Sequence, residues 1–102
     1  MSQRFAKQYS KAPERLIVTL TEPFNYNAYT AFHESYKDES GQGQIEFDFR
    51  HVDTIDSAAL GMLLIAREHY GNDNNRVFIS NLNGYAQKVV MATKLDSMFT
   101  II

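Results

Sequence analysis

The 102-residue chain contains no cysteine, and this absence removes several kinds of chemistry. Without a thiol there are no disulfides, no thiol catalysis and no thiolate metal ligands, which is compatible with a reducing compartment. The histidines His33, His51 and His69 lack the short spacing that is typical of zinc ligands. The sequence therefore predicts neither a metal site nor a cofactor.

Long hydrophobic runs are also missing. The longest strongly apolar stretch, Ala58 to Ala66, is far shorter than the ~20 residues that cross a bilayer. Residues 1–15 contain no apolar core of the kind that a secretory signal requires. We therefore expect a soluble, cytoplasmic protein that does not insert into membranes.

Basic residues are too scattered for a nucleic-acid-binding surface. The ten lysine and arginine residues form no patch, and the formal net charge is −2, so no direct nucleic-acid partner is expected. The sequence has no Gly-x-x-x-x-Gly-Lys loop, and the pair Gly41 and Gly43 is too weak a signal for a nucleotide site.

The residues that are present suit one globular domain. Hydrophobic residues make up 44% of the chain and aromatic residues 13%, which is enough for a core. The chain is short, and no repeat, low-complexity tract or interior linker divides it. We expect a single domain over residues 1–102.

Hydrophobic periodicity predicts strands that alternate with helices. The clearest strand is Ile45–Arg50, where apolar and polar residues alternate. Strands are expected over 3–9, 15–21, 45–50, 76–82 and 97–102, and helices over 27–39, 57–70 and 84–93. Asn25 or Asn27 is a plausible cap for the first helix, and Gly71 a stop for the second. This order predicts an α/β domain whose helices pack on a mixed sheet of four to five strands.

Aromatic residues recur at helical spacing, which usually marks the core. This is the expectation for Tyr29, Phe32, Tyr36 and Tyr85. In the last helix Tyr85, Val89 and Ala92 are expected to share one side. Two interpretations remain open for Met62 and Met91, which are either core residues or exposed contacts for a partner.

The most informative stretch is 45–67, a strand followed by a short loop and an apolar helix that begins near Asp56-Ser57. At such a junction backbone N–H groups are unpaired and the helix dipole favours negative charge. A phosphate on Ser57 would land on a surface that responds to it, which suggests a switch. The alternative is that Ser57 is an ordinary helix N-cap, worth about 1 kcal/mol. For Asp56 the alternative to a functional role is a favourable interaction of its carboxylate with the helix dipole.

This stretch resembles the STAS domain of the bacterial anti-sigma factor antagonists. That family carries a strand ending in an aspartate and then Asp-Ser-x-x-Leu-Gly at the start of a helix, which Asp48 and residues 56–61 match. The tail, VVMATKL followed by Leu95–Phe99, resembles the usual ending of the family. The resemblance covers nearly the whole chain and is strongest over 45–67.

The resemblance implies a protein-binding adaptor that is not an enzyme. Its partner would be an anti-sigma factor that is also a serine protein kinase. While Ser57 is unphosphorylated, this protein would sequester that partner, and the sigma factor would be released. The kinase would bind ATP and phosphorylate Ser57, and a serine phosphatase would reverse the modification. The partner-binding residues would be Asn25, Asp53, Asp56, Ser57, Ala58 and Gly61.

Two departures from the family are visible in the sequence. Many members have glycine where this chain has Ala59. Members also often place an acidic residue shortly after the second strand, and this chain has Asn25 in that neighbourhood.

Other interpretations stay open for the site. Asp53 is more simply a solvated loop residue, and Asp48 more often orders the loop than touches a partner. A STAS module that is never phosphorylated could serve as a scaffold or as a subunit of a larger transport or signalling complex. A hydrolase with Ser57 as nucleophile is disfavoured because no Gly-x-Ser-x-Gly elbow surrounds it, and His51, close in sequence, lies in a loop.

Overall fold

A mixed sheet of five strands runs through residues 4–102, the part of the chain that this computed structural model describes. The strands are β1 (Ala6–Lys11), β2 (Glu14–Thr21), β3 (Ile45–His51), β4 (Val77–Ser80) and β5 (Thr100–Ile101). The helices are α1 (Tyr29–Tyr36), α2 (Ser57–His69) and α3 (Gly84–Ala92), with the 3-10 turns η1 (Tyr26–Ala28) and η2 (Leu95–Ser97). None of these helices is long and apolar enough to cross a membrane.

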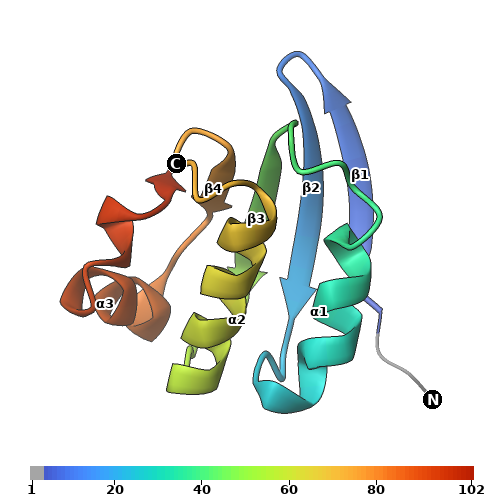
Figure 1. The fold of residues 1–102 in the computed structure, drawn as a ribbon. Helices are drawn as coiled ribbons and strands as arrows, with labels where there is room; N and C mark the ends of the chain where they lie inside the picture. The colour runs from blue at the N-terminus through green and yellow to red at the C-terminus, as the bar shows by residue number, and fades with distance from the viewer. Residues whose placement is uncertain (1–3) are drawn as a thin grey trace.

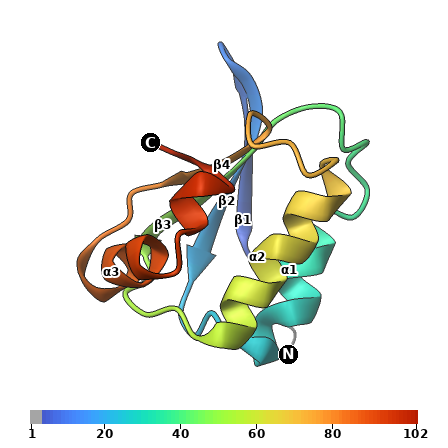
Figure 2. The same cartoon turned by 60° about the vertical axis from the view of Figure 1, so that its left-hand side comes forward.

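The order of the strands in the sheet is the order in the chain, β1-β2-β3-β4-β5. β1 pairs with β2 antiparallel, and the other neighbouring pairs are parallel. Each parallel pair is joined through a helix, because a return to a parallel neighbour requires a crossover connection. Figures 1 and 2 show α1 and α2 side by side over the sheet and α3 beyond β4. The predicted α/β domain with a mixed sheet is confirmed.

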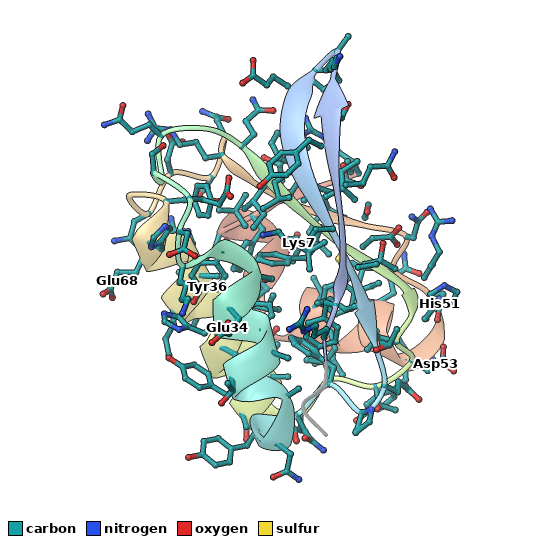
Figure 3. All side chains as sticks on the ribbon, turned by 90° about the vertical axis from the view of Figure 1, so that its right-hand side faces the viewer. Lys7, Glu34, Tyr36, His51, Asp53 and Glu68 are labelled. Atoms are coloured by element: carbon teal, nitrogen blue, oxygen red, sulfur yellow. The ribbon has the colours of Figure 1, made fainter. Side chains whose placement is uncertain are left out.

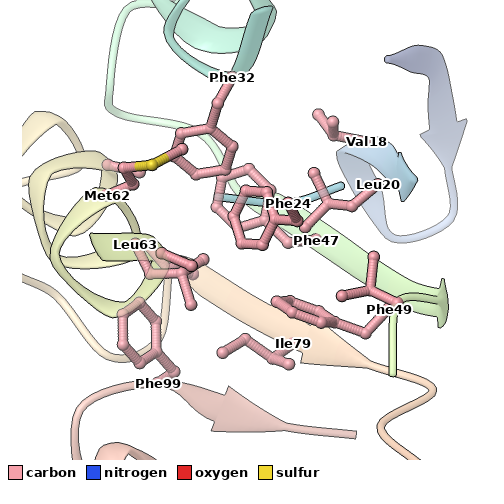
Figure 4. Close-up of a cluster of buried hydrophobic side chains, with 14 of the residues drawn as sticks. Val18, Leu20, Phe24, Phe32, Phe47, Phe49, Met62, Leu63, Ile79 and Phe99 are labelled. Atoms are coloured by element: carbon pink, nitrogen blue, oxygen red, sulfur yellow. The ribbon is translucent and has the colours of Figure 1, made fainter. Parts of the chain in front are cut away.

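The core lies between this sheet and the helices. Alternate residues of β2 and β3 are buried there, as their periodicity predicts. Figure 4 shows Val18, Leu20, Phe47 and Phe49 from these strands packed against residues of the helical layer such as Phe32, Met62 and Leu63. β2 and β3 stay in one register from Leu16 with Ile45 to Thr19 with Asp48, and the register shifts before Thr21 pairs with His51 at their carboxyl ends. The loops that follow therefore start from strand ends that are packed into the core.

Element boundaries differ from the predictions most at three places. The first helix, expected over 27–39, is the 3-10 turn Tyr26–Ala28 followed by the α-helix Tyr29–Tyr36. The first strand continues to Lys11, because the hairpin turn occupies only Ala12-Pro13; residue 3 of the predicted strand lies outside the described residues. The last strand is confined to Thr100–Ile101, since Leu95–Ser97 form a 3-10 turn and Phe99 is buried in the core.

The predicted inward face of α3 is wrong. Ala86 and Val90, one helical turn apart, are fully buried, whereas Tyr85 is 59% exposed and Ala92 is also exposed. Small residues let the helix approach the core closely, and the outward position leaves the tyrosine hydroxyl in water. Alanine gives a weak signal in a hydrophobic pattern, so the aromatic residue drew the assignment to the wrong face.

Candidate functional site

Ser57 lies at an accessible junction between the sheet and α2. The loop that leads to it is tied to the core by Val52 and Ile55, whose side chains are buried. Ser57 itself is exposed, and its hydroxyl makes no hydrogen bond to any residue within 4–102. The oxygen is therefore free to meet solvent or a partner.

The N-cap of α2 is Asp56. Its backbone is extended, with φ −98° and ψ 178°, and its carboxylate accepts a hydrogen bond from the Ala59 N–H at 2.8 Å. The alternative interpretation of Ser57 as the cap is therefore wrong, because Ser57 is already the first residue of the helix. The N–H groups of Ser57 and Ala58 have no acceptor within the helix, as is usual for a first turn.

A shallow groove runs beside this junction. One wall is the connection between β2 and α1, residues 22–25, and the other is the end of the β3–α2 loop, residues 54–56. Tyr85, at the start of α3, completes the lining. The groove brings together Asn25 and Asp56, two of the residues that the family resemblance assigns to a partner surface. Ser57, Ala58 and Gly61 lie on α2 outside its lining.

Two carboxylates line the groove, and a third acidic residue lies next to it. Glu22 and Asp56 line it, and Asp53 is joined to it because its backbone N–H donates to Glu22 Oε1 at 2.8 Å. No lysine, arginine or histidine lines the groove in the described part of the chain. The rim is therefore negatively charged before any phosphate is added.

The sequence interpretation missed Glu22. It sought the acidic position after the second strand near Asn25, whose role in the structure is to cap η1 by accepting from the Asn27 N–H at 2.9 Å. Glu22 directly follows β2 and precedes Pro23, so the end of the strand was the signal that could have located it.

Asp48 orders the backbone behind the site. It is 3% exposed and accepts hydrogen bonds from the Arg50 N–H at 2.9 Å, from Arg50 Nε at 2.8 Å and from Asn81 Nδ2 at 2.9 Å. These bonds tie the end of β3 to Asn81, which has a left-handed backbone with φ 56° just after β4. Asp48 therefore fixes the ends of two strands and is turned away from a partner.

An apolar strip continues from Ser57 along the outside of α2. It consists of Ala58, Gly61, Leu64 and Ile65, and we call it the α2 strip. Leu64 is 37% and Ile65 is 48% exposed, while Ala58 and Gly61 are half-buried. Apart from its chain neighbours and the backbone of α2 itself, no atom lies within 4 Å of the position that a Cβ would take at Gly61, so this part of the surface is open.

The structure distinguishes the two methionines for which the sequence allowed either a core or an exposed position. Met62 is 3% exposed and belongs to the core, whereas Met91 on α3 is 56% exposed.

The histidines do not form a catalytic or metal site with Ser57. His33 stacks on Tyr29 within α1, and His69 packs edge-on against Tyr36 and Tyr70, which places His69 in the contact between α1 and α2. In residues 4–102 no hydrogen bond joins Ser57 to a histidine, and no three metal-ligating side chains cluster. The nucleophile–base contact of a serine hydrolase is therefore not formed in the described part of the chain.

Comparisons with known proteins agree with this fold. The fold superimposes on the crystal structure of TM1081 from Thermotoga maritima, a candidate anti-sigma factor antagonist, with a TM-score of 0.78 at 19% identity over 95% of this chain and 84% of that one. The NMR structure of TM1081 gives a TM-score of 0.77 at 16% identity, over 100% of this chain and 82% of the other.

Sequence comparisons point the same way. A STAS-domain containing protein of Pseudomonas aeruginosa (strain UCBPP-PA14), PA14_20770, is 26% identical over 89 residues, which span 86% of this chain and 88% of the relative. The sequence model of the STAS domain matches residues 6–102. The chain therefore belongs to the STAS domain family.

Proposed function

We propose that this protein is an anti-sigma factor antagonist, switched by phosphorylation of Ser57. The observation that carries the proposal is the exposed Ser57 hydroxyl at the first residue of α2, beside a groove with an acidic rim. Family membership supports a role in binding other proteins rather than in catalysis. A cytoplasmic location, where a sigma factor acts, is part of the proposal.

The unphosphorylated form binds an anti-sigma factor that is also a serine protein kinase. The rim of Glu22, Asp53 and Asp56 suits a partner surface with basic side chains, since complementary charge favours encounter and fixes the orientation of docking. The α2 strip gives the same partner an apolar contact next to the serine. Asn25, Ala58 and Gly61 complete this surface in the proposal.

Phosphorylation opposes docking through charge. It adds about −1.5 to −2 charges and three acceptor oxygens next to the Asp56 carboxylate. The phosphate would be buried against the apolar contact that the α2 strip makes next to the serine and beside Asp56, so its desolvation and its repulsion from Asp56 are not compensated there, and every ~1.4 kcal/mol weakens binding tenfold. Within the free domain the unpaired N–H groups of Ser57 and Ala58 lessen the cost. The fold tolerates the phosphate while the complex does not, and a serine phosphatase restores binding.

The proposal is tested with three variants as baits in a native lysate. Ser57→Ala is expected to retain the kinase partner, and Ser57→Asp to retain at least tenfold less of it, as quantified by mass spectrometry. Ser40→Asp is the matched control, because Ser40 is an exposed serine in the α1–β3 loop, away from the groove. Equal capture by Ser57→Ala and Ser57→Asp would contradict the switch.

A scaffold that is never phosphorylated is the second candidate. The α2 strip favours it, because an apolar docking surface functions without a phosphate cycle. Protein isolated from its native cell under several growth states distinguishes the two, since the switch predicts a phosphorylated fraction at Ser57 and the scaffold predicts none.

A further inference from the structure

A single side chain joins the two walls of the groove. The Glu22 carboxylate, at the end of β2, accepts a hydrogen bond from the Asp53 N–H in the loop after β3, with Oε1 and N 2.8 Å apart. The two residues are 31 positions apart in the sequence. This bond therefore sets how far the loop before Ser57 stands from the opposite wall.

The rest of that loop shows why this contact matters. Val52 and Ile55 are anchored by burial, and Asp56 is anchored by its bond to the Ala59 N–H. Asp53 and Thr54, between these anchors, are both exposed. In residues 4–102 the bond to Glu22 is the hydrogen bond that ties this exposed pair to the remainder of the fold.

We propose that Glu22 is a positioning residue for Ser57. Its carboxylate holds the Asp53 amide and so fixes the loop that presents the serine hydroxyl to whatever binds or modifies it. The importance of that presentation rests on the proposed function of Ser57, whereas the positioning itself is a property of the free domain and is measured without a partner.

Two substitutions separate positioning from charge. Glu22→Gln retains an oxygen that accepts the Asp53 N–H but removes the negative charge, whereas Glu22→Ala removes both. Glu68→Ala is the matched control, because it removes an exposed acidic side chain in the last turn of α2. Figure 3 shows Glu68 and Asp53 on opposite sides of the molecule.

The test is amide hydrogen exchange and chemical shift by NMR on each folded variant. In Glu22→Ala the Asp53 amide is expected to exchange about tenfold faster, with shift changes at residues 54–57. Glu22→Gln should stay within about threefold of the unsubstituted protein, because a neutral acceptor gives a weaker bond of the same geometry. Unchanged Asp53 exchange in Glu22→Ala, or shift changes that do not reach Ser57, would overturn the proposal.

Phosphorylation of the same variants by the cognate kinase gives a second readout. Positioning predicts a slower rate for Glu22→Ala and near-normal modification of Glu22→Gln. Equal losses in both variants would show that the charge of the rim matters and would overturn the positioning role. If even the unsubstituted protein is not modified, the proposed switch fails, and the amide measurements still decide the role of Glu22.

Discussion

At the scale of single residues, the Tyr36 hydroxyl stands out because its hydrogen-bonding capacity is unsatisfied in the described part of the chain. Its side chain is 1% exposed, and within residues 4–102 its hydroxyl oxygen is buried without a hydrogen-bond partner. Its ring packs edge-on against Phe32 and His69 in the contact between α1 and α2. The ring therefore stabilises the fold, while the hydroxyl imposes a desolvation cost.

We expect Tyr36→Phe to leave stability unchanged or to raise it by about 1 kcal/mol at neutral pH, because the substitution keeps the ring and removes the orphaned hydroxyl. Urea unfolding of the two proteins measures the difference. A loss of more than about 1 kcal/mol would show that the hydroxyl is satisfied, for example by an internal water.

The same tyrosine predicts how stability depends on alkaline pH. Burial raises the pKa of Tyr36 to about 12 from 10.0, and burial also raises the pKa of Tyr70. Because the folded pKa is the higher one, the stabilisation is complete below the unfolded value. It is lost between about pH 10 and 12, where the unfolded chain releases its proton first.

Urea unfolding at about pH 9 and about pH 11 should therefore show a fall in stability for the unsubstituted protein. The fall should be smaller, though still present, in Tyr36→Phe, because Tyr70 continues to titrate. An identical fall in both proteins would contradict the assignment to Tyr36.

Residue roles at the site were only partly predictable from the sequence. The position of Ser57 at the strand–helix junction follows from local periodicity, and the structure confirms that it is exposed. Aspartate and serine both cap helices well, so the sequence does not show which of Asp56 and Ser57 is the N-cap. The structure decides it, because the extended backbone is that of Asp56. The contact of Glu22 with Asp53 joins distant segments, so no local pattern contains it.

At the scale of the elements, the loop between α1 and β3 is docked onto the end of α2. Gly41 has φ +80°, and a Cβ placed on it would collide with the backbone carbonyl of His69. The Nε2 atom of His69 also lies 2.7 Å from the backbone carbonyl oxygen of Glu39, which belongs to the same loop. This contact fixes the end of α2 that lies away from Ser57.

Gly41→Ala is expected to destabilise the protein by about 2 kcal/mol or more, because it combines a left-handed backbone with a backbone collision. Gly43→Ala is the control, since no other atom lies within 4 Å of its Cβ position and the change should be within about 0.5 kcal/mol. Thermal unfolding of both variants measures this, and similar losses at the two glycines would contradict the account.

The elements themselves were predictable because β2, β3 and α2 carry strong periodicity. The face of α3 was not, since small residues form its buried side. The choice between Gly41 and Gly43 depends on a tertiary contact with α2 that the sequence of the loop does not express.

At the scale of the whole molecule, the proposed docking surface combines a charged rim with the α2 strip. Leu64→Gln with Ile65→Gln is expected to weaken binding of the proposed kinase partner by at least tenfold, because the exposed apolar contact is lost. Stability should change by about 1 kcal/mol or less, since both side chains are already partly exposed. Titration with the purified partner measures the affinity.

Met91→Gln serves as the control for this pair, because it removes an exposed apolar side chain from α3 instead of α2. Equal weakening by the control would show that the partner does not distinguish the α2 strip from other apolar surface.

The sequential order of the sheet has a consequence for what can occupy this end of the molecule. In open α/β sheets, metabolites settle into the crevice formed where connections from adjacent strands depart in opposite directions. From β1 to β5 every connection advances the same way, so the described fold has no such point of divergence. A compound meant to block the proposed switch would therefore have to compete with the proposed protein partner across an open face.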